Sequence, residues 1–211
     1  MAPGLRDAKR TAVAQRLAAT AFDQVRERGF GEVTVDDVVA EAEVSRRTFS
    51  NYYSCKEAAV AAVVVDRAEA ALREWQPPTA ADPLTLVSDL VDHQIRVGAF
   101  GSLTEVAALA VGHPQLVPFV REAQWQLWVA VGDRVLDVLP GAGDDDVETV
   151  RLAVGALFGI VSASLIGSGD RSGAGNLRGA VHRGIARLGT GLGHFDPDGP
   201  GGPAAHDHQG V

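Results

Sequence analysis

The fold of this chain is decided by residues 34–57, which read TVDDVVAEAEVSRRTFSNYYSCKE. Thr34 and Asp37 have the spacing of a capping box with a shortened acid, and the valines that follow Thr34 recur at helical intervals. Ser45 is typical of a residue that caps the start of a second short helix, which we expect to run to about Tyr52. Two short helices joined by a tight turn at residues 42–44 form a helix-turn-helix.

The second short helix has an unusual outward face. If Phe49 points toward the core, the remaining side chains of residues 45–53 are Ser, Arg, Thr, Asn and Tyr. These types donate to phosphates and to the edges of guanine and adenine. The plain alternative is a polar surface helix of a bundle. However, no acidic residue lies between Val44 and Cys55 in a chain of net charge −8, which favours DNA binding.

Helical periodicity continues along the chain. Besides the two short helices, it predicts helices at residues 6–28, 56–75, 83–99, 103–111, 115–139, 145–167 and 174–191. No alternating strand pattern is present in the sequence. We therefore expect an all-α protein. Its three-helix head occupies residues 1–56, its helical body occupies residues 57–192, and a Gly- and Pro-rich tail at 193–211 is expected to be disordered.

Charge and composition restrict the possible partners. Residues 1–56 carry 9 basic and 8 acidic side chains, whereas residues 57–211 carry 10 and 19. The body should repel nucleic acid, and the head should not. The single cysteine, Cys55, is typical of a reducing compartment, here the cytoplasm. Residues 152–169 are uncharged, but they end in Gly and Ser and lack flanking anchors, so we expect a buried helix and no membrane partner.

Signatures of catalysis and metal binding are missing from the sequence. It has no nucleophile elbow and no phosphate-binding loop. The acidic residues at 144–148 are those expected at a helix start. We therefore predict neither an enzyme nor a cofactor or metal site.

The segment 34–57 resembles the N-terminal domain of the TetR family of bacterial transcriptional regulators, and with the residues before it the resemblance covers about 50 residues. The pairs that carry the resemblance, at the family's spacing, are Gly29-Phe30, Thr34-Val35, Val44-Ser45, Thr48-Phe49, Tyr52-Tyr53 and Lys56-Glu57. Two positions depart from the family pattern. Glu43 stands where the turn glycine is usual, and Ser50 stands where many members have Tyr. Residues 60–211 match only in the number and length of helices.

The resemblance implies a regulator that binds a palindromic operator in double-stranded DNA as a homodimer, most often a repressor released by a small molecule. It implies that Thr34 contacts a phosphate at a helix start. The full set of implied DNA contacts is Thr34, Ser45, Arg46, Arg47, Thr48, Ser50, Asn51, Tyr52 and Lys56.

The last two predicted helices each carry a stripe that suits the implied dimer. Small residues recur every four positions at Gly155, Gly159 and Ala163, which permits close helix approach. The following helix carries an apolar stripe that includes Leu177, Val181 and Ile185. The alternative is that both stripes pack inside one subunit.

A ligand pocket is expected between helices 83–99 and 115–139, because the second is apolar on several faces. The candidate lining residues are His93, Arg96, Phe100, Phe119, Arg121, Trp125 and Trp128. The head segment also resembles regulators associated with acyl-CoA-like ligands. That likeness implies a hydrophobic or amphipathic effector, with Arg96 and Arg121 binding an anionic group. The alternative is a solid core.

Two other functions stay open at this point. The chain could be a helical enzyme or lipid carrier that does not bind DNA. It could also be a regulator controlled by a protein partner rather than by a small ligand.

Overall fold

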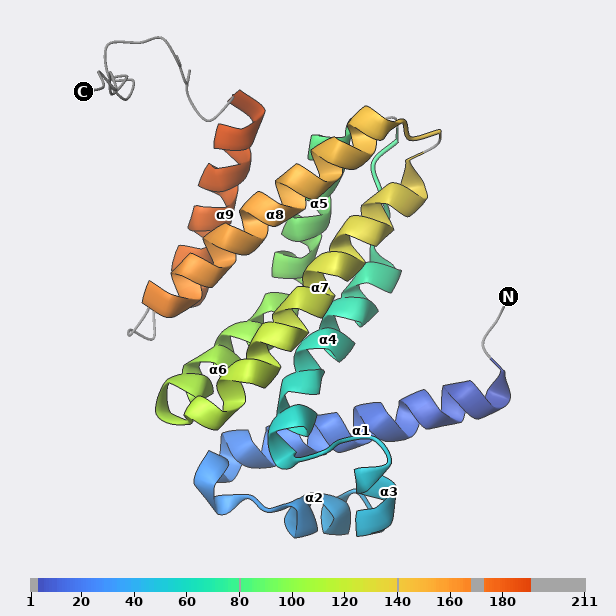
Figure 1. Cartoon of the computed structure of the whole chain (residues 1–211), viewed down its shortest axis with the longest axis vertical. Helices are drawn as coiled ribbons and strands as arrows, with labels where there is room; N and C mark the ends of the chain where they lie inside the picture. Colours follow the sequence, from blue (N-terminus) through green and yellow to red (C-terminus); the bar gives the residue numbers. More distant parts are fainter. Residues whose placement is uncertain (1–3, 80, 140, 168–172, 191–211) are drawn as a thin grey trace, which may run out of the picture.

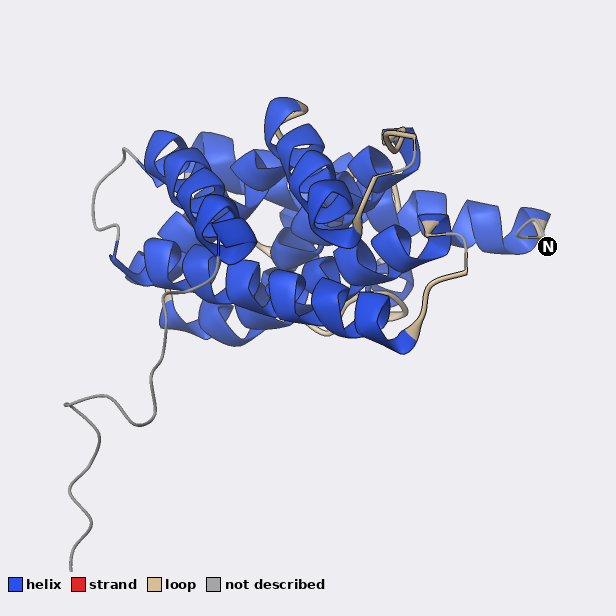
Figure 2. Ribbon diagram, turned by 90° about the horizontal axis from the view of Figure 1, so that it is seen from above, coloured by secondary structure: helices blue, strands red, loops and turns tan. Residues whose placement is uncertain are grey.

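The computed structural model describes residues 4–79, 81–139, 141–167 and 173–190. Within these ranges it contains nine α-helices, two short 3-10 helices and no strand (Figure 2). The helices are α1 (Leu5–Arg28), η1 (Phe30–Glu32), α2 (Val35–Glu41), α3 (Arg46–Ser50), α4 (Lys56–Glu74), α5 (Pro83–Arg96), α6 (Ala99–Gly112), η2 (Pro114–Leu116), α7 (Val117–Val138), α8 (Asp144–Gly167) and α9 (Gly173–Thr190). The all-α prediction is confirmed.

Helices α1 to α3 form one end of the molecule, and α4 rises from that end into the body (Figure 1). In the head α4 packs against α1, and in the body it packs against α6 and α7. One hydrophobic core therefore runs from Leu17 and Phe22 through Val64 to Leu127. The predicted domain boundary at residue 56 falls on the first residue of α4. The predicted tail at 193–211 lies outside the described residues.

Three local features differ from the sequence prediction. Gly98 adopts a left-handed backbone (φ 79°), so α5 ends at Arg96 and α6 begins earlier than expected, at Ala99. Pro114 begins a 3-10 turn between α6 and α7, which the periodicity did not indicate. Helix α3 ends at Ser50 rather than near residue 52, because the chain turns there toward α4. None of these changes the order of the helices.

The helix expected at residues 152–169 forms most of α8, and residues 168–169 lie outside the described residues. Helix α8 packs against α5, α7 and α9, with Val150, Leu157 and Val161 buried. Among the described residues, no single helix combines the length and the hydropathy needed to cross a bilayer. Helices α5 and α6 reach those values only as a pair, and they are bent by 70° relative to each other.

Candidate nucleic-acid interface

The turn between α2 and α3 is a Schellman motif, in which backbone N–H groups bind the last carbonyls of a helix. The Val44 amide donates to the Val39 carbonyl (3.0 Å), and the Glu43 amide donates to the Ala40 carbonyl (3.3 Å). The motif requires a left-handed residue, and Glu43 supplies it with φ 52°. Glu43 therefore does what a turn glycine would do, as the sequence predicted, without the freedom of glycine.

One face of helix α3 packs against the core of the head, and the opposite face is exposed to solvent. Phe49 is 2% exposed, and its ring lies 5.8 Å from that of Tyr53. The Tyr53 hydroxyl donates to the Ala14 carbonyl on α1 (3.0 Å). Burial raises the pKa of Tyr53, so this hydroxyl keeps its proton at any physiological pH. These contacts fix the helix so that its other face meets solvent.

Three hydroxyls expected to contact DNA already have partners inside α3. Ser45 caps the helix by accepting from the Thr48 amide (3.0 Å), and the two hydroxyls lie 2.8 Å apart. The Ser50 hydroxyl donates to the Arg46 carbonyl (3.1 Å). They hold the shape of α3, and further contacts would have to share these groups.

The long polar side chains of α3 are the exposed ones. The Arg46 guanidinium lies 3.4 Å from the Asp36 carboxylate, but both side chains are 68% exposed. Such a surface pair contributes little stability and yields easily. Arg47 and Asn51 are exposed as well. Within the described residues, their side chains form no hydrogen bond or ion pair, so both are available to a partner.

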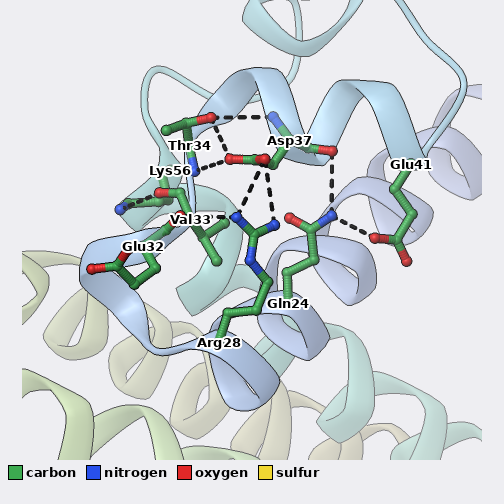
Figure 3. A network of polar contacts seen from close by, with 8 residues as sticks. All are labelled: Gln24, Arg28, Glu32, Val33, Thr34, Asp37, Glu41 and Lys56. Carbon is green, nitrogen blue, oxygen red and sulfur yellow. Dashed lines mark hydrogen bonds and ion pairs between the residues drawn. The ribbon is translucent and has the colours of Figure 1, made fainter.

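A polar network fixes the start of α2 (Figure 3). Thr34 and Asp37 form the predicted capping box, and Arg28 reaches Asp37 from α1 at 3.3 Å. The hydrogen bonds from Thr34, together with the charge of Arg28, lower the pKa of Asp37. Gln24, also on α1, donates to the Asp37 carbonyl (3.2 Å) and to Glu41. Helix α2 is thus held rigidly against the end of α1.

Most of the hydrogen-bonding capacity of Lys56 is used inside the protein. Its ammonium donates to the carbonyls of Phe30 and Val33, both at 2.6 Å, and lies 4.1 Å from the centroid of the Phe30 ring. An ammonium has three protons, so one remains for a phosphate. Lys56 mainly joins the start of α4 to the segment that leads into α2. The Phe30 ring also lies 4.6 Å from that of His113, at the corner between α6 and α7.

Comparison with known families identifies this head. Residues 17–63 match the family described as bacterial regulatory proteins of the TetR family. The chain carries the DNA-binding domain of the TetR family. It is a DNA-binding transcriptional regulator, and the family is regulatory rather than enzymatic.

The fold of this TetR-family chain is also that of solved regulators. It is similar to a TetR-family regulator from Syntrophomonas wolfei, with TM-score 0.59 and 17% identity over 88% of this chain and 99% of the other. A TetR regulator from Rhodococcus sp. RHA1 gives TM-score 0.51 and 20% identity over 84% and 97%. Thermus thermophilus FadR, a repressor solved with lauroyl-CoA, gives only 0.45 and 22% identity over 90% and 100%. No curated protein matches the sequence.

The body of this TetR-family chain contains two grooves on α8. The α6–α8 groove, of about 470 Å³, is lined by Ala107, Ala110, Val111, Val117, Val120, Arg121, Gln124, Phe158 and Ser162. The α7–α8 groove, of about 400 Å³, is lined by Trp125, Trp128, Val129, Gly132, Asp133, Leu136, Val150, Arg151, Val154, Gly155 and Phe158. Phe158 borders both, and its ring stands edge-on to both tryptophans at 6.2 Å. Sequence reasoning missed Phe158, which looks like any core aromatic on an apolar helix.

The predicted ligand residues are only partly brought together. Arg121 lines the α6–α8 groove, and Trp125 and Trp128 line the α7–α8 groove. Phe100 is buried against Trp128, with the ring centroids 6.2 Å apart. Phe100 and the other three lie outside the residues that line the two grooves. His93 hydrogen-bonds the Ala71 carbonyl on α4 (3.0 Å), Arg96 is exposed at the end of α5, and Phe119 is half-buried on α7.

One residue that lines the α7–α8 groove has a buried polar atom without a partner. The Trp128 side chain is 2% exposed, and its indole N–H has no hydrogen-bond acceptor within the described structure. A buried donor without an acceptor costs free energy, about 1–3 kcal/mol. A ligand acceptor within reach of this N–H would remove the cost. Elsewhere, the described residues contain no group of three His, Cys, Asp or Glu able to hold a metal ion.

The two predicted dimer stripes differ in their surroundings. Gly155 and Gly159 are exposed, and a Cβ added to either would meet no atom within 4 Å. Ala163 is exposed too. In contrast, Val181 is fully buried inside the protomer, because α9 packs on α8 and α5 through this face. Ile185 is half-buried, and the side chain of Leu177 lies outside the described residues.

Proposed function

We propose that this TetR-family regulator is a repressor that binds a palindromic operator as a homodimer and leaves it when a small ligand binds. The observation that carries the DNA contacts is the exposed face of α3, anchored by Phe49 while Arg47 and Asn51 have no partner within the described protein. Such a regulator works where the DNA is, so we expect the cytoplasm of a bacterium.

The side chains of α3 and its neighbours would make different kinds of contact with DNA. The Arg47 fork suits guanine, and the Asn51 amide suits adenine. Arg46 can leave its exposed pair with Asp36 to bind a phosphate. Thr34, Tyr52 and the remaining proton of Lys56 would contact the DNA backbone, which sets register rather than sequence. Ser45, Thr48 and Ser50 support the helix from within.

The α6–α8 groove is the better candidate for the effector site. Its lining is mostly aliphatic, with Arg121 and the hydrogen-bonded pair Gln124–Ser162 (2.9 Å) as its polar groups. A small number of polar groups in an apolar groove is typical of a ligand site. A single guanidinium without a lining carboxylate favours an amphipathic effector with an anionic group.

The contacts of His113 suggest how the ligand would act on DNA binding. In the sequence His113 lies between Val111 and Val117, which line the α6–α8 groove, and its ring packs against that of Phe30. Phe30 in turn packs under Lys56, which holds the entry to α2. A ligand that favours a different position of the α6–α7 corner would therefore shift α2 and α3. Linkage then requires that DNA weaken ligand binding by the same factor.

The test begins with selection of bound duplexes from a random pool by the full chain. Replacement Arg47→Ala should weaken binding to the selected duplex by about 1–3 kcal/mol and relax the preference at one position of each half-site. Arg26→Ala, an exposed change on α1, is the matched control and should change neither. The assignment of α3 fails if Arg47→Ala binds the selected duplex with unchanged affinity and preference.

A further inference from the structure

The first turns of α1 project beyond the rest of the head. The hydrogen bond from Tyr53 to the Ala14 carbonyl marks where the end of α3 meets α1. Residues 5–13 continue past that point, a length of about 14 Å at the rise of an α-helix. Figure 1 shows this end of α1 reaching past α3. The TetR family match begins only at residue 17, so it assigns no role to the projection.

The projection is basic in an acidic protein. Residues 5–22 carry four basic side chains and one acidic, whereas residues 23–43 carry two and seven. Arg6, Lys9 and Arg10 are exposed, and none forms an ion pair with another described residue. The other basic stretch of the head is residues 44–56, which contains α3 and has no acidic residue. Positive charge is therefore concentrated at α3 and at the start of α1.

Helical register gives the side from which these side chains emerge. Gln24 and Arg28 follow Arg6 and Arg10 by 18 residues, which is about five turns, so each pair shares one side of α1. Both Gln24 and Arg28 contact α2 (Figure 3). Arg6 and Arg10 therefore leave α1 on the side where the helix-turn-helix lies, and Lys9 lies roughly 60° from Arg6 around the helix.

We propose that Arg6, Lys9 and Arg10 bind phosphates of the operator outside the segment that α3 reads. Duplex DNA continues past each half-site with one negative charge for about every 1.7 Å, so a basic helix beside α3 has phosphates to meet. These contacts carry no base preference and lengthen the footprint of each head. The proposal rests on DNA binding by this head, and its test separates the two.

The test uses the full chain and the duplex selected from a random pool. One version of the duplex ends at the bases that selection requires. The other continues for about six base pairs on each side, which is about 20 Å and therefore longer than the projection. The variant combines Arg6→Gln, Lys9→Gln and Arg10→Gln, since Gln forms helices nearly as well as Lys and Arg. Arg26→Gln is the control. It is exposed on α1 but turned by roughly 200° from Arg6.

The unmodified protein should bind the extended duplex about tenfold more tightly than the trimmed one at moderate salt. Its plot of log affinity against log salt should be steeper on the extended duplex, by about 0.9 for each added phosphate contact. The triple variant should bind both duplexes alike, and the Arg26→Gln control should keep the difference.

Three results would overturn the proposal. The triple variant could keep the full advantage of the extended duplex. It could lose affinity equally for both duplexes, which would place the contact inside the recognised segment. It could keep DNA binding but lose binding to phosphatidylglycerol vesicles, which would make the projection a membrane contact. If the unmodified protein prefers no duplex over random DNA, the assignment of α3 fails as well.

Discussion

Glu43 shows how one residue can set the geometry of the DNA-binding head at a cost in stability. A left-handed backbone costs a residue with a Cβ about 1–2 kcal/mol, and glycine avoids this but loses about 0.5–1 kcal/mol of chain entropy. Glu43→Gly should therefore raise the free energy of unfolding by about 0.5–1 kcal/mol, measured by urea denaturation. It should also tighten operator binding at low salt, because a negative charge leaves the turn.

The control for this prediction is Glu43→Gln, which removes the charge and keeps the strained backbone. It should reproduce the gain in DNA affinity without the gain in stability. If Gln stabilises the protein as much as Gly does, the left-handed conformation is not the cause.

Asp66 lies on α4, the helix that joins head and body, and it lowers the free energy of unfolding by an amount that depends on pH. One of its carboxylate oxygens is buried without a hydrogen-bond partner in the described structure. Burial, and then the charge of Glu69, raise its pKa above 3.8. The folded state therefore favours the protonated form, so the carboxylate lowers stability at neutral pH, and this cost disappears as the pH falls through the raised pKa.

Asp66→Asn should accordingly raise the free energy of unfolding at pH 7 by about 1 kcal/mol, the low end for a buried unpaired group because the residue is only partly buried. The advantage over the unmodified protein should shrink steadily as the pH is lowered toward 4, measured by thermal unfolding. Asp23→Asn, at an exposed position of α1, should show neither effect. An advantage independent of pH would contradict the role of the charge.

At the scale of elements, the outer face of α8 is the surface that a second copy would cover. Gly155, Gly159 and Ala163 make it smooth, and Leu152 (66% exposed) and Trp125 (59% exposed) add apolar area around them. Gly159→Leu meets open space in the protomer, so folding should survive. Across a dimer interface the same change overpacks, which costs about 1–3 kcal/mol at each copy.

Light scattering at micromolar concentration should give about 44 kDa for the unmodified protein, twice the chain mass of 22.0 kDa. Gly159→Leu should shift it toward 22.0 kDa with little change in helix content by circular dichroism. The matched control is Gly101→Leu, a helical glycine on α6 that also faces open space. A monomer for the unmodified protein would contradict the proposed dimer.

At the scale of the whole molecule, communication between the ligand groove and DNA should depend on the contact of His113 with Phe30. His113→Ala should leave operator and effector affinities within about twofold of the unmodified protein when each is measured alone. It should reduce the weakening of DNA binding by the effector at least fivefold, since coupling energies are typically about 1–3 kcal/mol.

The measurement is operator affinity with and without a compound that raises the melting temperature in a screen of fatty acids, acyl-CoAs and hydrophobic drugs. Gln115→Ala, exposed in the same corner, is the control and should keep the full effect. If His113→Ala keeps the full effect too, the signal travels by another route.

Local rules were enough for much of this protein. The helix starts at Thr34 and Ser45 and the helix end at Gly29 depend on atoms within a few residues. The residue types at these positions therefore predict them. The burial of Phe49 follows in the same way from helical periodicity, whereas the left-handed turn at Glu43 was expected only from the family resemblance. These features define the head, and hence the DNA-binding function, before any tertiary contact is known.

Packing between distant segments decided the rest. Lys56 binds carbonyls 23 and 26 residues away, and nothing in its neighbourhood indicates that its charge is used inside the protein. The stripes that contain Gly159 and Val181 both suggested an interface from their periodicity. However, Gly159 is exposed, whereas Val181 is buried in the protomer. A helical pattern shows which residues share a face, whereas the neighbouring helix that covers this face is chosen by the free energy of the whole core.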